Sequence, residues 1–67
     1  SNTIWINIPN ADFENLIIYN SLGQEMKSKR IDNLDLVAIP ISELTQGSYI
    51  LELSRGQHFI RKTFIKK

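Results

Sequence analysis

The stretch IPISELTQGSYILEL, residues 39–53, has a strand pattern at each end and mostly polar residues between them. From Tyr49 onward, Leu51 and Leu53 recur at every second position, which is typical of a half-buried β-strand. Upstream, an apolar strand pattern runs to Ile41. The stretch therefore predicts two strands joined by a short connection, and this connection decides how the two parts of the domain are assembled.

The connecting residues SELTQG, 42–47, are predicted to form one short helical turn. Ser42 is a favourable N-cap and Gly47 a favourable helix end, whereas the segment is too short for a longer stable helix. Such a turn can carry the chain from one sheet to another, with Leu44 closing the open end between them. Tyr49 then begins the next strand with its ring inside and its hydroxyl near the rim.

Period-two patterns and short apolar runs continue along the rest of the chain, separated by turn signals. We expect strands at residues 3–8, 14–20, 24–30, 36–41, 48–54 and 58–67. The fold class is predicted to be all-β: a small antiparallel Ig-like β-sandwich of about six to seven strands with one short helical turn. Structural turns are expected at Gly23, Gly47 and Gly56, because glycine adopts positive φ at little cost. The expected core consists of Ile4, Ile6, Leu16, Ile18, Val37, Ile39, Tyr49, Leu51 and Leu53.

Three of these strands carry more specific patterns. The run LIIY, residues 16–19, has no polar face and is predicted to be covered on both sides or close to it. QEMKSKR has Met26 as its only apolar residue and is expected at an exposed sheet edge, protected by Lys and Arg. In the last strand, Phe59 and Phe64 fall on opposite faces unless a bulge near Arg61 brings them together, and both arrangements remain open.

The composition is typical of one small globular domain. The chain has 67 residues, of which 42% are hydrophobic and 22% charged, and it has no cysteine. Disulfides, thiolate catalysis and cysteine-ligated zinc are therefore excluded. No apolar run approaches the ~20 residues that a membrane-spanning helix requires. We interpret Ser1 and Asn2 as a pair added for expression, and residues 3–67 as a single β-sandwich domain.

The formal net charge is only +1, but the charges are unevenly distributed. Residues 1–26 contain three acids and no Lys or Arg, whereas residues 55–67 contain five cations and no acid. A basic C-terminal end suits phosphates, anionic lipid or an acidic protein surface. The alternative is a solvated edge strand that Lys and Arg protect against aggregation. The sequence leaves both interpretations open.

Residue types that carry chemistry are sparse. His58 is the single histidine, so a histidine-based metal cluster is excluded. Two pairs of carboxylates lie near turns, Asp12 with Glu14 and Asp32 with Asp35, but their spacing lacks the ligand density of a calcium loop. The three glycines stand alone and form no phosphate loop. Trp5 is one outward aromatic and a weak signal for a binding platform. We therefore predict no enzyme, no cofactor, no metal and no nucleic-acid partner.

Three segments together resemble the C-terminal sorting domain of the type IX secretion system of Bacteroidetes. They are LIIYNSLGQEM, IPISELTQGSYILEL and the closing FIRKTFIKK. The family pattern has a strand ending in Ile-Tyr and a polar residue, a turn with glycine, an I-x-I-S-x-L segment, G-x-Y-I-L and a short tail ending in Lys. In this chain these places are filled, in order, by Ile18-Tyr19-Asn20, Gly23, residues 39–44, Gly47 with Tyr49, and Lys66-Lys67.

The chain departs from this pattern near its start. Such domains usually begin with a P-N-P strand, but here Pro9-Asn10 is followed by Ala11 and lies between the first two expected strands. It is more consistent with a turn. We therefore expect the first strand or its leader to lie upstream, and the sheet to have an open edge on that side.

The resemblance implies a sorting label with no catalysis of its own. It implies an N-terminal cargo domain attached covalently, recognition by outer-membrane type IX translocon components, and removal by a sortase-like peptidase. The implied route is periplasm in transit, then secretion or the cell surface. We expect the recognition residues to be Gly47, Tyr49, Ile50, Leu51, Lys66 and Lys67. A weak dimer through open sheet edges is also expected. The alternative function is an accessory β-sandwich module that binds carbohydrate or protein and stays on a secreted product.

Overall fold

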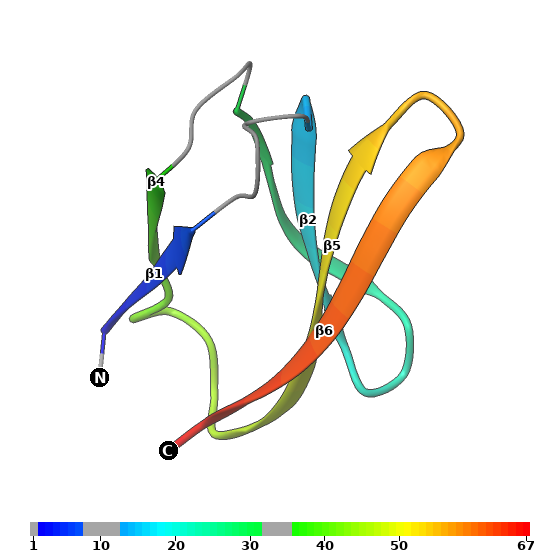
Figure 1. Ribbon diagram of the computed structural model, residues 1–67. Helices are drawn as coiled ribbons and strands as arrows, with labels where there is room; N and C mark the ends of the chain where they lie inside the picture. Colours follow the sequence, from blue (N-terminus) through cyan, green and yellow to red (C-terminus); the bar gives the residue numbers. More distant parts are fainter. Residues whose placement is uncertain (1, 8–12, 32–35) are drawn as a thin grey trace.

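The computed structural model describes residues 2–7, 13–31 and 36–67. They form strands and no helix (Figure 1). The strands are β1 (Thr3–Asn7), β2 (Asn15–Asn20), β3 (Glu25–Arg30), β4 (Leu36–Pro40), β5 (Gly47–Arg55) and β6 (His58–Lys66). Each lies within a segment where the sequence predicts a strand or extends it by one residue, so the all-β prediction is confirmed.

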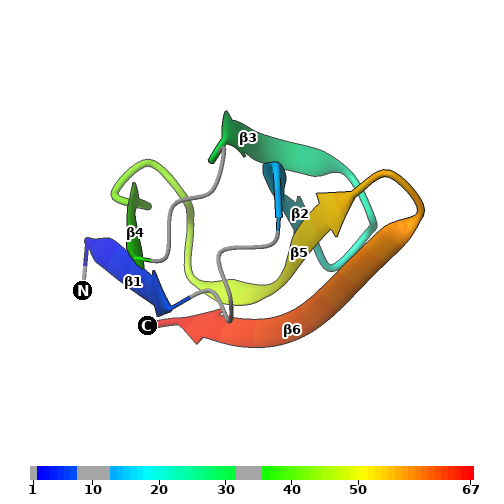
Figure 2. The same ribbon diagram turned by 45° about the horizontal axis from the view of Figure 1, so that its top comes forward.

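The strands form two antiparallel sheets. One is the pair β1–β4, and the other has four strands in the order β3-β2-β5-β6. The small pair lies beside the curved four-stranded sheet (Figures 1 and 2). This arrangement confirms a small antiparallel β-sandwich. The Ig-like label is not confirmed, because the described strands divide as two and four, whereas an Ig-type sandwich divides its strands as four and three or more.

The core lies on the inward faces of β2, β4 and β5. Leu16 stands opposite Leu53 and Ile18 opposite Leu51, so each pair shares one face of the sheet. The buried residues are Phe13, Leu16, Ile18, Ile31, Val37, Ile39, Ile41, Leu44, Tyr49, Leu51 and Leu53. Ile4 and Ile6 were also expected in this core, but they are only partly buried and pack against its side.

Phe13 and Ile31 are core residues that the sequence pattern placed in turns. Both lie just outside strands, and backbone hydrogen bonds hold them against the sheet. The N–H of Ile31 donates to the carbonyl of Glu14 over 2.8 Å, and the N–H of Glu14 donates to the carbonyl of Ser54 over 2.9 Å. The burial of Phe13 and Ile31 depends on contacts between distant segments, and these contacts cannot be predicted from periodicity along one strand.

The helical turn expected over residues 42–47 is not confirmed. The structure has a single hydrogen-bonded turn there, in which the N–H of Leu44 donates to the carbonyl of Ile41 over 3.0 Å. The physical reason lies in the side chains around it. The carbonyls of Leu44 and Thr45 accept hydrogen bonds from the side chains of Lys66 and Tyr49, respectively, instead of from a following helical N–H. Leu44 is nevertheless buried, as expected for a residue that closes the end of the sandwich.

The structure refines the expectation about one strand and decides between the two alternatives left open for another. β2 is central, but only its inward residues are fully buried, and Ile17 and Tyr19 on the other face are partly exposed. The β5–β6 ladder is continuous, without a bulge near Arg61, and the irregularity lies instead in β2–β3 after Ile18. Phe59 and Phe64 therefore stay on opposite faces of the sheet.

The hairpin between β5 and β6 is tight. Two residues, Gly56 and Gln57, separate the strands, and Gly56 has φ +59°. Two-residue hairpins of the favoured types need positive φ at their first central residue. This explains why glycine stands at that position, and it fixes the register in which β6 lies along the sheet edge.

Candidate recognition site

Residues 41–46 connect the small sheet to the large one, and we call them the crossover. Tyr49, at the start of β5, holds the crossover from inside. Its hydroxyl donates to the backbone carbonyl of Thr45 over 2.6 Å and lies 3.3 Å from the Thr45 hydroxyl. Its ring stacks on Phe64 with 5.5 Å between the ring centroids. The tyrosine thus fills the core and satisfies a crossover carbonyl, a device that β-sandwiches use at corners between sheets.

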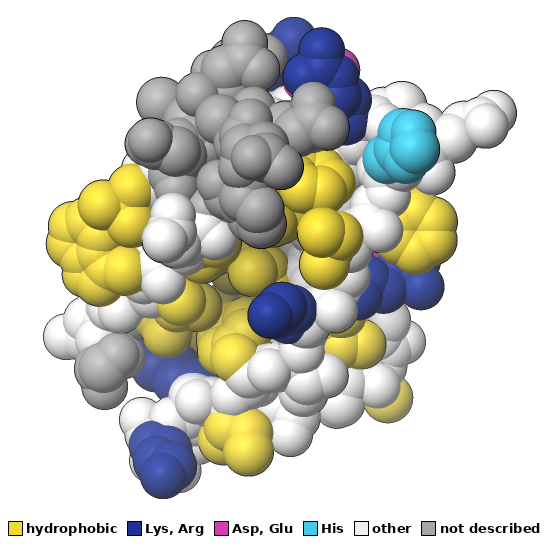
Figure 3. Space-filling view, in the orientation of Figure 1, with side chains coloured by type: hydrophobic (Ala, Val, Ile, Leu, Met, Phe, Trp, Pro, Cys, Tyr) yellow, Lys and Arg dark blue, Asp and Glu magenta, His cyan; other side chains and the backbone are white. Residues whose placement is uncertain are grey.

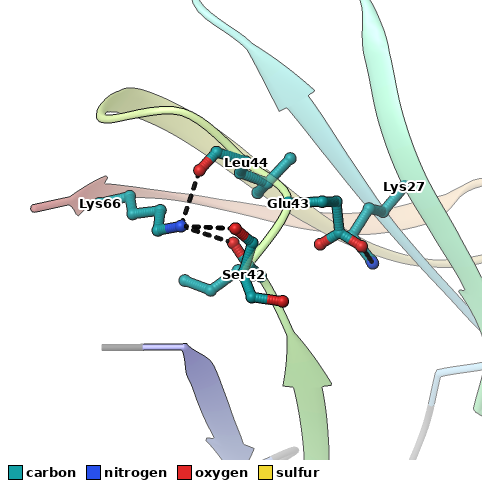
Figure 4. Close-up of polar contacts among 6 residues, drawn as sticks. Lys27, Ser42, Glu43, Leu44 and Lys66 are labelled. Carbon is teal, nitrogen blue, oxygen red and sulfur yellow. Dashed lines mark hydrogen bonds and ion pairs between the residues drawn. The ribbon is translucent and has the colours of Figure 1, made fainter.

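Lys66, at the end of β6, holds the same crossover from the other side. Its ammonium donates to the backbone carbonyls of Leu44 (2.7 Å), Ile41 (2.8 Å) and Ser42 (3.3 Å) (Figure 4). These are three acceptors for the three N–H bonds of an ammonium group. A lysine that sequence analysis placed in a recognition tail is thus also a structural cap.

A third contact reaches the crossover from β3. The Lys27 ammonium lies 2.7 Å from a carboxylate oxygen of Glu43 (Figure 4). Hydrogen bonding to Lys27 holds the pKa of Glu43 below its usual value. Because Glu43 is exposed, this ion pair contributes little to stability. It nevertheless places a paired acid and base on the outer surface of the crossover.

Replacing Lys66 by methionine is expected to destabilise the domain by about 1–2 kcal/mol, because three carbonyls lose a charge-assisted partner. Methionine keeps most of the apolar stem, so packing changes little. The measurement is the free energy of unfolding in urea. The matched control is Lys67→Met, at an exposed neighbour, with an expected change within about 0.5 kcal/mol. Equal effects of the two substitutions would show that the Lys66 contacts carry no net stability.

The residues expected to be read by a partner separate into two groups. Tyr49 and Leu51 are buried, with exposed fractions of 4% and 8%, so they support the surface from beneath. Gly47 and Lys67 are exposed, and Ile50 is partly exposed. Ile50 lies on the other face of the sheet, near Tyr19 and Arg61. Gly47 instead stands opposite Lys66, so the start of β5 and the end of β6 share one surface. The crossover residues Ser42 and Glu43 share this surface, and sequence reasoning had not included them.

The outer face of β6 carries a different set of contacts. The Arg61 guanidinium lies 2.8 Å from a carboxylate oxygen of Glu52 and 4.7 Å from the centroid of the Phe59 ring. The Tyr19 hydroxyl reaches the other Glu52 oxygen over 3.5 Å, and desolvation followed by the Glu52 charge raises the pKa of that phenol. Arg61 is thus paired within the sheet, whereas Lys62 and Lys67 are exposed and form no ion pair with an acidic side chain of the described residues.

A groove opens between β1 and β6 (Figure 3). It consists of two hollows of about 360 and 380 Å³ that share Ile4, Trp5 and Phe64. Figure 3 shows apolar side chains in this part of the surface with Lys or Arg beside them. The first hollow is lined by Ile4, Trp5, Ile6, Asn7, Leu51, Leu53, Ile60, Lys62, Thr63 and Phe64. We call the two hollows together the β1–β6 groove.

The described part of the chain offers little for catalysis or metal binding. It contains no cluster of three or more His, Asp or Glu side chains able to hold a metal ion. In the same residues, every buried side-chain nitrogen or oxygen has a hydrogen-bond partner. Over these ranges no helix has the length and apolar character needed to cross a membrane.

Taken together, the fold and this surface define a small β-sandwich module whose polar groups serve mainly to hold a sheet-to-sheet crossover and a basic terminal strand. Residues 1–67 match one protein family, described as the secretion system C-terminal sorting domain. The match spans the whole chain, and the chain belongs to this family. It is a C-terminal sorting signal of type IX secretion, which directs an attached protein across the outer membrane toward the cell surface or the extracellular space.

Comparison with curated proteins and with solved structures gives no match. The family assignment therefore rests on the sequence pattern over the full chain. It does not favour the alternative of an accessory binding module retained on a secreted product.

Proposed function

We propose that outer-membrane components of the type IX translocon recognise this domain in its folded state, after the attached cargo has entered the periplasm. A sortase-like peptidase then separates the domain from its cargo. The domain acts as a substrate and performs no catalysis. The family assignment supports this proposal, as does the structural use of its polar side chains, since Tyr49 and Lys66 hold the crossover and Glu52 pairs with Arg61.

The observation that carries the proposal is the different placement of the two terminal lysines. Lys66 is bound to crossover carbonyls, whereas Lys67 is exposed beside it. The cap holds the end of β6 against the crossover, and Gly47 stands opposite Lys66, so Lys67 and Gly47 lie at one ordered surface. Exposed charge of one sign steers an encounter with a complementary surface and adds little to fold stability. We assign recognition to this surface.

The test uses a reporter that is directed to the periplasm and fused in front of the domain, in a host with type IX secretion. Replacing Lys67 by alanine is expected to leave the domain folded and to trap the fusion in the periplasm. The measurement is the fraction of reporter outside the cell, together with the melting temperature of the purified domain. The matched control is Lys29→Ala, which removes an exposed cation from the opposite sheet edge.

Normal export of the Lys67→Ala fusion would leave this lysine as edge protection and would contradict the proposed surface. Equal loss of export in the Lys29→Ala fusion would indicate a response to net charge alone. Lys66→Ala is less informative, because loss of its carbonyl contacts affects folding and export together. Its comparison with Lys67→Ala separates the structural role of the tail from its recognition role.

A further inference from the structure

The inward side of the sandwich is incompletely covered along the β1–β6 groove. Ile4 and Ile6 of β1 point to the same side as Ile39 and Val37 of β4, yet they are only partly buried. Across the groove, Ile60 is 39% exposed. Ile4, Ile6 and Ile60 are apolar and occupy the inward positions of their strands, as core residues do. In the described structure they face a groove floored by Leu51 and Leu53.

The two strands that border the groove do not pair with each other. No Cα atom of β1 lies within 8 Å of a Cα atom of β6. Paired strands lie about 4.7–4.9 Å apart, so two successive spacings amount to about 9–10 Å. A separation above 8 Å excludes direct pairing and is compatible with one additional strand between them.

At the groove, the backbone also has an edge that is available for pairing with a further strand. Among the described strands, β6 pairs only with β5, and β1 only with β4. β6 therefore presents one edge whose N–H and C=O groups have no strand partner within the described residues. Such an edge is a template for strand addition, in which main-chain hydrogen bonds supply affinity and alternate side chains supply specificity.

The side chains of β6 define what the added strand must offer. Ile60, Lys62 and Phe64 stand opposite Leu53, Leu51 and Tyr49, so all three lie on the inward face. The inward sequence of β6 is therefore apolar, cationic and apolar. The described residues that line the two hollows include Lys62, Lys66 and Lys67 but no Asp or Glu. Opposite charges at facing positions stabilise a strand pair, and like charges destabilise it.

A second copy of this chain fits the groove poorly for the same reason. The two edge strands of the large sheet are β3 and β6. β3 contains three cations, Lys27, Lys29 and Arg30, against one acid, Glu25, and β6 contains Arg61, Lys62 and Lys66 and no acid. Either edge would bring further cations toward Lys62. Charge complementarity thus favours an acidic partner over self-association.

We propose that the β1–β6 groove receives one extended segment of a partner protein, and that this segment carries a carboxylate between two apolar residues at alternate positions, opposite Lys62. Its backbone pairs with the edge of β6, and its apolar side chains cover Ile60 and Phe64. The inference rests on the proposed function for the source of the segment, which is a component of the type IX machinery. The groove itself can be tested without that machinery.

The test is a titration of the 67-residue chain, labelled with nitrogen-15, with a blocked synthetic peptide of about seven residues, a length that matches a short strand. In the peptide, threonine alternates with valine, glutamate and valine. We expect shifts of amide resonances in β1 and β6. A peptide with lysine in place of glutamate should bind about fivefold more weakly, and so should one with a methylated backbone amide at the pairing edge.

Reversing the groove charge gives the sharper result. In the Lys62→Glu chain the preference should invert, so that the lysine peptide binds more tightly than the glutamate peptide. Lys62 is exposed, so the variant is expected to fold, and its melting temperature verifies this. The matched control is Lys29→Glu, at the far edge of the sheet, which should leave the preference unchanged.

Four outcomes would overturn the proposal. They are no binding at millimolar peptide, equal binding of the methylated peptide, an unchanged preference in the Lys62→Glu chain, and concentration-dependent shifts of β1 and β6 in the chain alone, which would make a second copy the occupant. The titration of the Lys62→Glu chain tests the groove in vitro, whereas export of the Lys67→Ala fusion tests the recognition surface. Lys67 also lines the second hollow, so failure of the groove is judged from the peptide titrations and failure of the recognition surface from export.

Discussion

Replacing Leu16 by alanine is expected to cost about 2–5 kcal/mol of folding free energy, because it leaves a cavity in a packed core. Leu16 is in the central strand β2, has an exposed fraction of 0% and faces Leu53. A chain of this length has a total stability of roughly 3–10 kcal/mol. We therefore expect the melting temperature to fall by roughly 10–30 °C, or the variant to be unfolded at room temperature. Differential scanning calorimetry measures this change.

The same substitution at Leu22 provides the matched control. Leu22 lies in the β2–β3 turn with 82% of its surface exposed, so Leu22→Ala should change stability by less than about 0.5 kcal/mol. A small effect at Leu16 would contradict the core described above. Leu51→Ala is expected to resemble Leu16→Ala, with a smaller loss because Leu51 borders the β1–β6 groove, where the structure can relax.

Replacing Gly47 by valine is expected to destabilise the domain by about 1–3 kcal/mol through backbone strain. Gly47 has φ +152°, a conformation that residues with a Cβ atom rarely adopt. A Cβ added there would meet nothing within 4 Å, so the cost comes from the backbone and not from a clash with neighbours. The measurement is the urea midpoint of unfolding at an unchanged m-value.

Two controls isolate this backbone effect. Ser48→Val introduces the same side chain at the next exposed position of β5, where stability should be nearly unchanged. A synthetic chain with D-alanine in place of Gly47 should be about as stable as the parent chain or more so, because positive φ is the normal range for a D-residue. If Gly47→Val and Ser48→Val have equal effects, the positive φ is not required for the fold.

The strands were predictable from local pattern because their chemistry repeats every two residues. In β5 the recurrence of Tyr49, Leu51 and Leu53 at every second position matches the buried face of the strand. The two-residue break at Gly56 likewise marks the hairpin to β6. These signals are local. Because the apolar face of each strand must point to the core, the pattern also fixes which face of the strand is inward.

The recognition surface was only partly predictable. The sequence pointed to the start of β5 and to the terminal lysines, and the structure brings these segments together. It could not distinguish Lys66 from Lys67, since their difference depends on carbonyl groups more than twenty residues away in the chain. A weak signal existed, because Lys66 has the inward parity of Ile60 and Phe64, whereas Lys67 lies beyond the strand.

The sequence by itself determined the all-β class, the strand positions to within a residue at each end, the glycine turns and the family, since each depends on residue type and spacing along the chain. Tertiary structure alone decided the division into sheets of two and four strands, the burial of Phe13 and Ile31, and the opening between β1 and β6. It also replaced the expected helical turn by a crossover held by Tyr49 and Lys66. The physical reason is that these features depend on which distant strands meet and which backbone carbonyls their side chains can reach, and periodicity along one strand contains neither.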